Sequence, residues 1–170
     1  MLLRPIMRAD ALSIFGYASS EAATRFMNFP RHTSLDESAR FSERCVRCWE
    51  DGSAYPWAVV LRATGAFLGS IELRVNPPRA DFGYVFSEPF WGNGYATEAA
   101  KTVVDWALGQ PELFRVWATC CPDNVGSARV LSKAGLMLEA RLDNWEARPQ
   151  RGERAGPSLM YAKTKPSASV

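Results

Sequence analysis

The sequence predicts a single domain of the mixed α/β (α+β) class, with a mostly antiparallel sheet of about seven strands and flanking helices. Apolar residues alternate with other residues through residues 55–75 and 81–87, as in strands with one buried face. Small and apolar residues recur at helical spacing directly after a glycine turn near residue 93. No internal repeat or long linker divides the 170 residues, so we expect one domain over residues 1–170.

The N-terminal third is expected to form two helices after a short strand. In order, we expect a strand at Leu2–Ile6, a helix at Ala9–Ser19, a loop at Thr24–Thr33 and a helix from Ser34 to about Glu50. Ser34 and Glu37 have the S-x-x-E spacing of a capping box, which satisfies backbone N–H groups at a helix start. Asp51-Gly52 is expected to end this helix.

An antiparallel meander of three strands should follow. We expect these strands at Tyr55–Leu61, Phe67–Val75 and Asp81–Ser87, with turns at Thr64-Gly65 and Asn76–Arg79. In the third strand, Phe82, Tyr84 and Phe86 share one face because side chains alternate along a strand. After the glycine turn and its helix, a further strand is expected at Phe114–Cys120.

The C-terminal part is expected to add one helix and two strands. Asn124 occupies an N-cap position before a helix at Val125–Ala134, and Gly135 is suited to end it. The segment Leu136–Lys163 should form two strands joined by an arginine-rich loop at Arg141–Arg154. We expect this loop to be solvated and partly neutralised, because its arginines alternate with three acidic residues, Asp143, Glu146 and Glu153.

The glycine turn at Gly92 and Gly94 is the strongest functional signal from the residues alone. Glycine permits backbone conformations and close approaches that a Cβ would block. The turn runs directly into a helix, whose first N–H groups and dipole favour an anion such as a phosphate. The alternative is an ordinary loop-to-helix turn without a ligand, since a bare G-x-G is a weak motif.

Composition excludes several classes of protein. A hydrophobic content of 47% excludes disorder, and a net charge of +2 gives no support to nucleic-acid binding. The apolar runs are too short to span a membrane, and the N-terminus lacks a secretory pattern, so we expect a cytoplasmic protein. The aromatic content is compatible with a homodimer.

The cysteines and the single histidine offer little for catalysis. The four cysteines form two pairs, and the second pair, Cys120-Cys121, lacks the spacer of a zinc site, so we expect free thiols and no metal. His32 stands beside a proline in an expected loop, where a histidine is usually solvated. A Ser-His-Asp site is therefore not favoured.

Two blocks of the sequence resemble the GNAT superfamily of N-acetyltransferases, most closely the Rim-type branch that acetylates N-termini of ribosomal proteins. Its pyrophosphate turn reads Q/R-x-x-G-x-G/A and is often followed by T-E-A in this branch. The corresponding residues here are Trp91, Gly92, Asn93, Gly94, Tyr95, Ala96, Thr97, Glu98 and Ala99, with Trp91 in place of Gln or Arg, as is common in this branch. Its N-x-x-S-x-x-V-L-x-K-x-G block is matched by Asn124, Ser127, Val130, Leu131, Lys133 and Gly135. Two blocks in order are far more specific than either alone.

The resemblance implies acetyl-CoA as co-substrate, bound where the sheet is splayed between the strands at Asp81–Ser87 and Phe114–Cys120. The pyrophosphate would take N–H groups from Gly92 to Thr97. Backbone near Val85 and Phe86 would pair with the pantetheine and polarise the acetyl carbonyl. The side chain of Asn124 would hydrogen-bond the pantetheine arm.

The acceptor would be a neutral primary amine. Asp81 and Glu72 are the candidates for a general base, and Ser127 and Tyr161 for the acid that protonates the leaving thiolate. Strand carboxylates are usually surface residues, and Ser127 is equally suited to satisfying backbone donors at its helix start. The branch often has an acidic residue four positions before the final-strand tyrosine, where this chain has Pro157, so the acceptor side is expected to differ.

The acceptor is left open by the sequence. A protein or peptide N-terminal α-amine comes first, and a small amine such as an amino acid, polyamine or antibiotic comes next. From other classes, a CoA-binding regulatory module without turnover and a different nucleotide-binding domain remain. The early loop at Phe26–Thr33, the second helix and the arginine-rich loop at Arg141–Arg154 would line the acceptor pocket.

Overall fold

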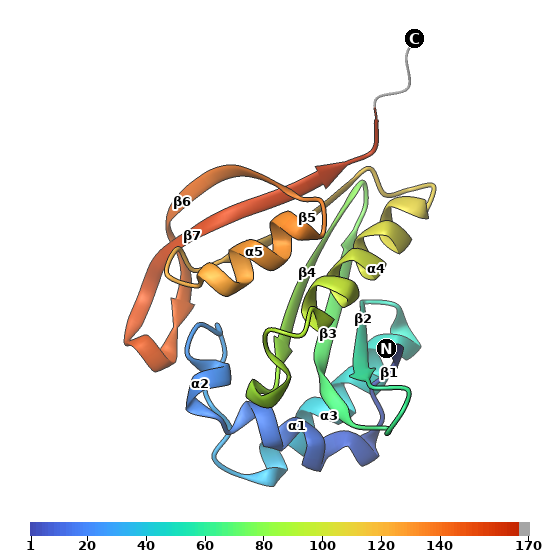
Figure 1. Ribbon diagram of the computed structural model, residues 1–170, viewed down its shortest axis with the longest axis vertical. Coiled ribbons are helices and arrows are strands. Elements are labelled where there is room, and N and C mark those ends of the chain that lie inside the picture. Colours follow the sequence, from blue (N-terminus) through green and yellow to red (C-terminus); the bar gives the residue numbers. More distant parts are fainter. Residues whose placement is uncertain (167–170) are drawn as a thin grey trace.

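The computed structural model describes residues 1–166 and contains one seven-stranded sheet (Figure 1). Its strands are β1 (Leu2–Pro5), β2 (Ala54–Val60), β3 (Phe67–Asn76), β4 (Arg79–Phe86), β5 (Arg115–Cys120), β6 (Met137–Arg148) and β7 (Glu153–Thr164). The helices are α1 (Ala11–Ala18), α2 (Glu21–Thr24), α3 (Leu35–Asp51), α4 (Tyr95–Gly109) and α5 (Val125–Lys133), with short 3₁₀ turns η1 (Arg8–Asp10), η2 (Glu88–Phe90) and η3 (Pro149–Arg151). The predicted mixed class and mostly antiparallel sheet are confirmed.

The strand order is β1-β2-β3-β4-β5-β7-β6, and all neighbours are antiparallel except β4 and β5. A parallel pair needs a crossover connection, which α4 supplies. β4 and β5 pair at three positions, from Arg79 opposite Arg115 to Asp81 opposite Trp117. Beyond this point the two strands continue without pairing to each other, so the sheet opens into a V.

Two apolar clusters form on the opposite faces of the sheet. α4 packs its small face, which includes Ala99, Ala100 and Ala107, against the larger cluster with β2 to β5. α1 and α3 cover the smaller cluster on the other face, where Ala58 and Val60 of β2 point. Small side chains let α4 approach the sheet closely, as its sequence pattern predicts. The helices therefore sit on both faces (Figure 1).

The predicted helix caps are confirmed. Glu37 accepts hydrogen bonds from the N–H groups of Thr33 (2.5 Å) and Ser34 (3.2 Å), which lower the pKa of its carboxyl. Gly52 ends α3 with φ +72°. At the end of α5, Gly135 has φ +89° and the N–H of Leu136 donates to the carbonyl of Leu131 (3.1 Å), a Schellman arrangement.

The prediction of a long arginine-rich loop at Arg141–Arg154 is largely wrong. β6 continues to Arg148 and β7 begins at Glu153, so only four residues connect them. Arg148 is 0% exposed rather than solvated, and its guanidinium donates to Glu153 (2.9 Å), to the carbonyl of Pro157 (2.9 Å) and to Ser158 Oγ (2.7 Å). These partners lie 5 to 10 residues away on β7, so the pairing of β6 with β7 orders a segment that its local composition marks as a loop.

The short helix α2 was not expected, and it lies beside the loop predicted at residues 24–33. Ser20 starts it by accepting a hydrogen bond from the N–H of Ala23 (3.3 Å). The tip of the β6–β7 hairpin lies beside this helix and the loop that follows (Figure 1). Within residues 1–166, no helix combines the length and the apolar character needed to cross a membrane.

The buried guanidinium of Arg148 predicts a large loss of stability on its removal. Arg148→Ala should lower the free energy of unfolding by about 2–4 kcal/mol, since it deletes three hydrogen bonds and leaves Ser158 buried without its donor. Urea denaturation measures this. The matched control is Arg154→Ala on β7, an exposed side chain, which should cost less than about 0.5 kcal/mol. Equal effects of the two substitutions would contradict the structural role of Arg148.

Candidate active site

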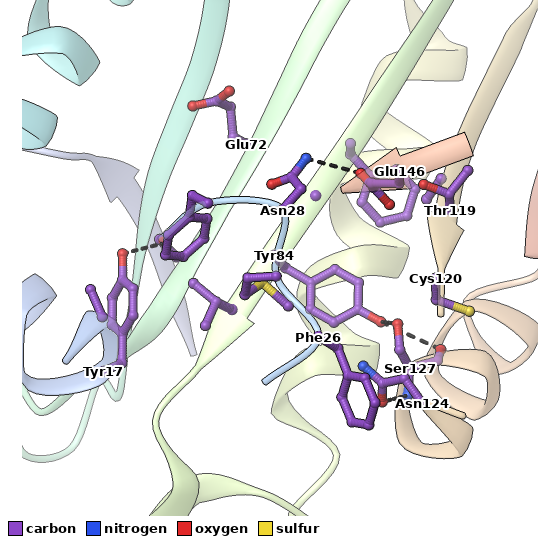
Figure 2. A pocket seen from close by; sticks show the side chains of 18 of the residues that line it. Tyr17, Phe26, Asn28, Glu72, Tyr84, Thr119, Cys120, Asn124, Ser127 and Glu146 are labelled. Atoms are coloured by element: carbon purple, nitrogen blue, oxygen red, sulfur yellow. Dashed lines mark hydrogen bonds between the residues drawn. The ribbon is translucent and has the colours of Figure 1, made fainter. Parts of the chain in front are cut away.

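A cavity of about 410 Å³ lies in the V between β4 and β5 (Figure 2). Gly83 to Val85 of β4 form one wall, and Ala118 to Cys121, at the end of β5, form another. The loop at residues 26–32, which we call the strap, lies over the cavity, and Glu146 of β6 completes that side. The open end of the parallel pair therefore creates a candidate ligand site that combines apolar walls with converging polar groups.

A hydrogen-bonded pair spans the V. Tyr84 Oη on β4 and Ser127 Oγ on α5 share a hydrogen bond of 2.7 Å, and both residues line the cavity. Asn124 fixes this end of α5, because its Oδ1 accepts from the N–H of Ser127 (3.1 Å). Burial raises the pKa of Tyr84, so its hydroxyl stays protonated at neutral pH. The predicted site residues Asn124 and Ser127 thus lie together at one wall.

The cavity thiol beside this pair is not an activated nucleophile. Cys120 lines the cavity, and burial raises its pKa to about 11, so the thiolate is scarce at neutral pH. Within the described residues, Cys45, Cys48, Cys120 and Cys121 are all free and buried.

The glycine turn lies outside the cavity lining, at the start of α4. Gly92 and Gly94 have φ +77° and +83°, and a Cβ at either position would meet no atom within 4 Å, so conformation rather than crowding requires glycine. The first bond of α4 runs from the N–H of Glu98 to the carbonyl of Gly94 (3.0 Å). Within residues 1–166, the N–H groups from Gly92 to Thr97 have no hydrogen-bond partner, which leaves a cradle of donors at a helix N-terminus.

Trp91 ties this cradle to the end of β4. Its indole Nε1 donates to the carbonyl of Phe86 (2.8 Å), and Asn93 Nδ2 donates to the carbonyl of Trp91 (3.0 Å). Of the two β4 residues expected at the cofactor, Val85 lines the cavity, whereas Phe86 is buried in the larger apolar cluster. The carbonyl of Phe86 is already occupied by Trp91, so only its N–H is left for a ligand on that side of the peptide.

Close packing against β3 sets the position of the last turn of β4. Gly69 on β3 lies opposite Phe86, and a Cβ on Gly69 would lie 2.3 Å from the carbonyl oxygen of Val85. The two strands therefore approach more closely than any side chain at residue 69 permits. This approach helps to fix the backbone of Val85 and Phe86 at the cavity.

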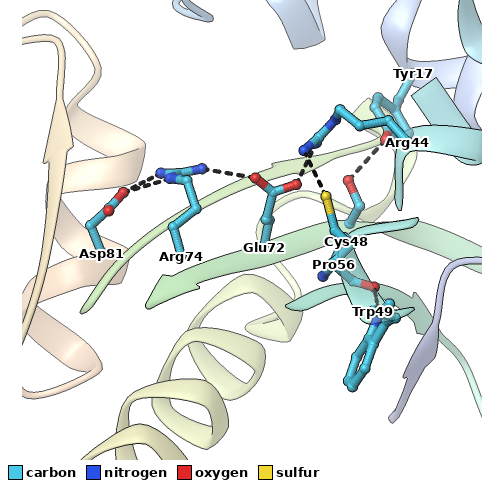
Figure 3. Close-up of polar contacts among 9 residues, drawn as sticks. Tyr17, Arg44, Cys48, Trp49, Pro56, Glu72, Arg74 and Asp81 are labelled. Carbon is cyan, nitrogen blue, oxygen red and sulfur yellow. Dashed lines mark hydrogen bonds and ion pairs between the residues drawn. The ribbon is translucent and has the colours of Figure 1, made fainter. Parts of the chain in front are cut away.

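The predicted bases Glu72 and Asp81 belong to a chain of ion pairs (Figure 3). One oxygen of Glu72 accepts from Arg44 (2.5 Å) and the other from Arg74 (3.2 Å). Arg74 also donates hydrogen bonds to Asp81 through its Nε (2.7 Å) and Nη2. Glu72 lines the cavity with both oxygens engaged, and Asp81 does not line it. Both carboxylates are therefore engaged by guanidinium groups, and of the two only Glu72 lies at the cavity.

Glu146 is the cavity carboxylate that the sequence analysis missed. It accepts from Asn28 Nδ2 of the strap (2.9 Å) and lies 3.7 Å from Arg148 and 3.5 Å from Ser158 Oγ (Figure 2). The sequence places it in a solvated loop, and no local signal contradicts this. Apolar alternation does not continue through residues 142–148, because the register with β7 shifts between Leu142 and Glu146 and Asn144 has φ +52°.

Tyr161 and His32 also differ from expectation. Tyr161 is buried in the larger apolar cluster and does not line the cavity, so the structure does not bring it to Ser127. His32 is half-buried and lines the cavity instead of being solvated. Its N–H donates to the carbonyl of Ala18 (2.9 Å), and its Nδ1 shares a hydrogen bond of 2.7 Å with Ser38 Oγ.

Comparison with known proteins identifies the class. A family model described as an acetyltransferase (GNAT) domain matches residues 1–137. The probable N-acetyltransferase YjcK of Bacillus subtilis (strain 168) is 33% identical over 147 residues, which cover 81% of this chain and 80% of that protein. The fold and these matches define an acetyltransferase, and the chain belongs to the GNAT family of N-acetyltransferases. The family resemblance is therefore confirmed.

Solved structures of related fold include proteins with different named acceptors. RimL, the ribosomal L7/L12 α-N-protein acetyltransferase in complex with coenzyme A, has a TM-score of 0.84 at 18% identity, over 95% of this chain and 92% of that one. Spermidine N-acetyltransferase from Vibrio cholerae, in complex with CoA and spermine, has a TM-score of 0.80 at 16% identity, over 96% and 94% of the two chains. Both likenesses establish the fold.

The contact at Gly69 predicts that a single methyl group there disturbs β4. Gly69→Ala should lower the free energy of unfolding by about 1–3 kcal/mol, because the new Cβ would overlap the backbone of Val85 and Phe86. Gly83→Ala on β4 is the control, since the nearest atom to its Cβ, a flexible Arg74 nitrogen, lies 3.7 Å away. Thermal unfolding of both variants tests this, and a Gly69→Ala protein as stable as Gly83→Ala would refute it.

Proposed function

We propose that this N-acetyltransferase moves the acetyl group of acetyl-CoA to a primary amine, first of all the N-terminal α-amine of a protein or peptide. One observation carries the proposal: a cradle of free N–H donors at the start of α4 is joined by β4 to a cavity between the splayed strands. The N–H donors at α4 are suited to bind a pyrophosphate, and the cavity is suited to bring a thioester and an amine together. RimL, of the same fold, is named for N-terminal acetylation of a ribosomal protein.

In the proposed complex, acetyl-CoA follows β4. Its pyrophosphate accepts from the N–H groups of Gly92 to Thr97, where the helix dipole also favours negative charge. Its pantetheine arm enters the V beside Val85 and Asn124, which both line the cavity. The N–H of Phe86, on the side of β4 away from β3, then faces the acetyl carbonyl and stabilises the oxyanion that forms there, whereas the N–H of its neighbour Val85 is directed toward β3.

The proposed reaction is a direct transfer. The amine nitrogen bonds to the acetyl carbon as the carbon–sulfur bond breaks, the amine gives up a proton, and the CoA thiolate takes one. Glu146 is our candidate for the base, in preference to Asp81 and Glu72. Its oxygens accept no hydrogen bond from a guanidinium, since that of Arg148 lies 3.7 Å away. Ser127, which shares a hydrogen bond with Tyr84, is our candidate for the acid. Tyr161 is no longer preferred, since it lies in the core.

A small-molecule amine is the second candidate acceptor. Spermidine N-acetyltransferase has the same fold, so the fold is compatible with both kinds of acceptor. A CoA-binding module without turnover is a further alternative. Thiol release from acetyl-CoA in the presence of a panel of peptides and small amines separates these cases. Tight acetyl-CoA binding without amine-dependent thiol release would favour the non-catalytic module.

The cradle predicts that Gly94 is essential for cofactor affinity. Gly94→Val should raise the Kd for acetyl-CoA at least about 10-fold, because a β-branched residue strains φ +83° and displaces the adjacent N–H donors. Calorimetric titration measures the Kd. The control is Gly109→Ala at the other end of α4, where a Cβ meets no atom within 4 Å. An unchanged Kd for Gly94→Val would refute the cradle as the pyrophosphate site.

A base that acts on the amine predicts a pH-dependent loss in Glu146→Gln. A free α-amine has a pKa of about 7.7–8.0, so it needs help near pH 7 and little above pH 9. We therefore expect kcat near pH 7 to fall about 100-fold, and the deficit to shrink as pH rises. Asp143→Asn on the same strand, an exposed side chain, should leave the pH–rate profile unchanged. A deficit in Glu146→Gln that is constant with pH would exclude Glu146 as base.

A further inference from the structure

Three aromatic rings form a continuous wall of the cavity on the side of the strap and α3. The ring centroids of Phe29 and His32 lie 6.0 Å apart, and those of His32 and Phe41 lie 6.5 Å apart. All three side chains line the cavity. We call them the aromatic wall. Tilted and edge-to-face rings at such distances leave ring faces and edges on which another aromatic group can pack.

The aromatic wall is held in place and is uncharged. The hydroxyl of Ser38, which is 0% exposed, pairs with Nδ1 of His32, and the backbone N–H of His32 is bound by the carbonyl of Ala18. Burial lowers the pKa of His32 below its usual value, so the imidazole is neutral at pH 7. The three rings of the wall are therefore fixed and uncharged, and the guanidinium of Arg44 lies over the ring of Phe41, 5.0 Å from its centroid.

The charges that line the cavity leave one position for an ammonium. They belong to Arg44, Glu72, Arg74 and Glu146. Glu72 is shared by both arginines, which occupy its two oxygens. Glu146 is the one carboxylate of the lining whose oxygens are outside hydrogen-bond distance of any guanidinium in residues 1–166. A second ammonium on the same substrate would find no further free carboxylate in the lining, because Arg44 and Arg74 occupy both oxygens of Glu72.

Glu146 and the aromatic wall line the same cavity. Asn28, the neighbour of Phe29, donates to Glu146, and Gln150 Nε2 donates to the carbonyl of Phe29 (3.3 Å). The guanidinium of Arg151 lies over the ring of Phe26, 5.4 Å from its centroid. The strap is thus fastened to the β6–β7 hairpin, and the carboxylate lies next to the wall.

We propose that the acceptor is a monoamine with an aromatic or bulky apolar body, which packs on Phe29, His32 and Phe41 while its single ammonium is bound by Glu146. This inference rests on the proposed transfer of acetyl to a primary amine and narrows it. An N-terminal residue with an aromatic side chain and a free arylalkylamine both have this chemistry. A polyamine does not.

Matched amines test the inference with the intact chain and acetyl-CoA. Thiol release is measured with 2-phenylethylamine against ethylamine, with a tripeptide Phe-Gly-Gly against Gly-Gly-Gly, and with spermidine. In the pair with the higher activity, we expect the amine that carries the ring to have a kcat/KM about 10- to 100-fold above that of its partner, because a benzyl group is buried. Spermidine should have the lowest kcat/KM of the five amines.

The outcomes separate the two proposals. Thiol release that is equal within each pair, or strongest with spermidine, overturns the monoamine inference and leaves the acetyl transfer intact. Tight acetyl-CoA binding without thiol release in the presence of any of the five amines overturns the transferase proposal itself. A preference for the ring in either pair together with poor use of spermidine supports the inference.

Variants of the wall give a second, independent readout. Phe41→Ala should lower kcat/KM for 2-phenylethylamine about 10-fold and that for ethylamine less than about 2-fold, with the KM for acetyl-CoA unchanged. Phe29→Ala is the replacement variant where Phe41→Ala fails to fold. The control is Phe114→Ala, an exposed aromatic residue outside the cavity lining, which should change neither value. Equal losses for both amines in Phe41→Ala would overturn the assignment of the wall.

Discussion

The separation of β4 from β5 is the constraint on which the rest of the site depends. The two strands pair at three positions and then diverge, with α4 as the crossover between them and α5 following β5 in the chain. Strand edges that lose their partner must find other hydrogen bonds or a ligand. Here the opening is bridged by side chains at Tyr84 and Ser127, and the cavity lies beside that bridge. A fully paired β4–β5 ladder would leave no such space.

The buried arginine of the β6–β7 hairpin illustrates how the acceptor side is ordered. Arg148 is 0% exposed, and its Nε has no hydrogen-bond partner in residues 1–166, so its burial carries a desolvation cost. An apolar residue of similar size would avoid that cost. The guanidinium instead joins Glu153, Pro157 and Ser158, and Ser158 in turn lies near Glu146. The network fixes the strand that presents the cavity carboxylate, so its benefit lies in geometry more than in stability.

The sequence was sufficient wherever the signal is local. The capping box at Ser34, the Gly135 helix end and the glycine turn follow from backbone conformation and from hydrogen bonds a few residues apart. It was insufficient for Glu146, whose partner Asn28 is 118 residues away in the chain, and for His32, which lies against Ala18 and Phe41 of other helices. The partners of Arg148 are only 5 to 10 residues away, but they become its neighbours only when β6 and β7 pair as a hairpin. β6 has no continuous alternation, because its register shifts between Leu142 and Glu146 and Asn144 has φ +52°.

The contrast between local signals and contacts between separate segments also explains why the acetyl donor is easier to infer than the amine that accepts the acetyl group. The proposed donor contacts are mostly backbone N–H groups, and their geometry needs only two residues with positive φ and a helix start. Proteins of this fold at 16–18% identity are named for a ribosomal protein or for spermidine. The proposed acceptor end consists of side chains on the strap, α3 and β6, whose identity the fold does not dictate. In this proposal the charge balance and the rings of that end, rather than the fold, set which amine is accepted.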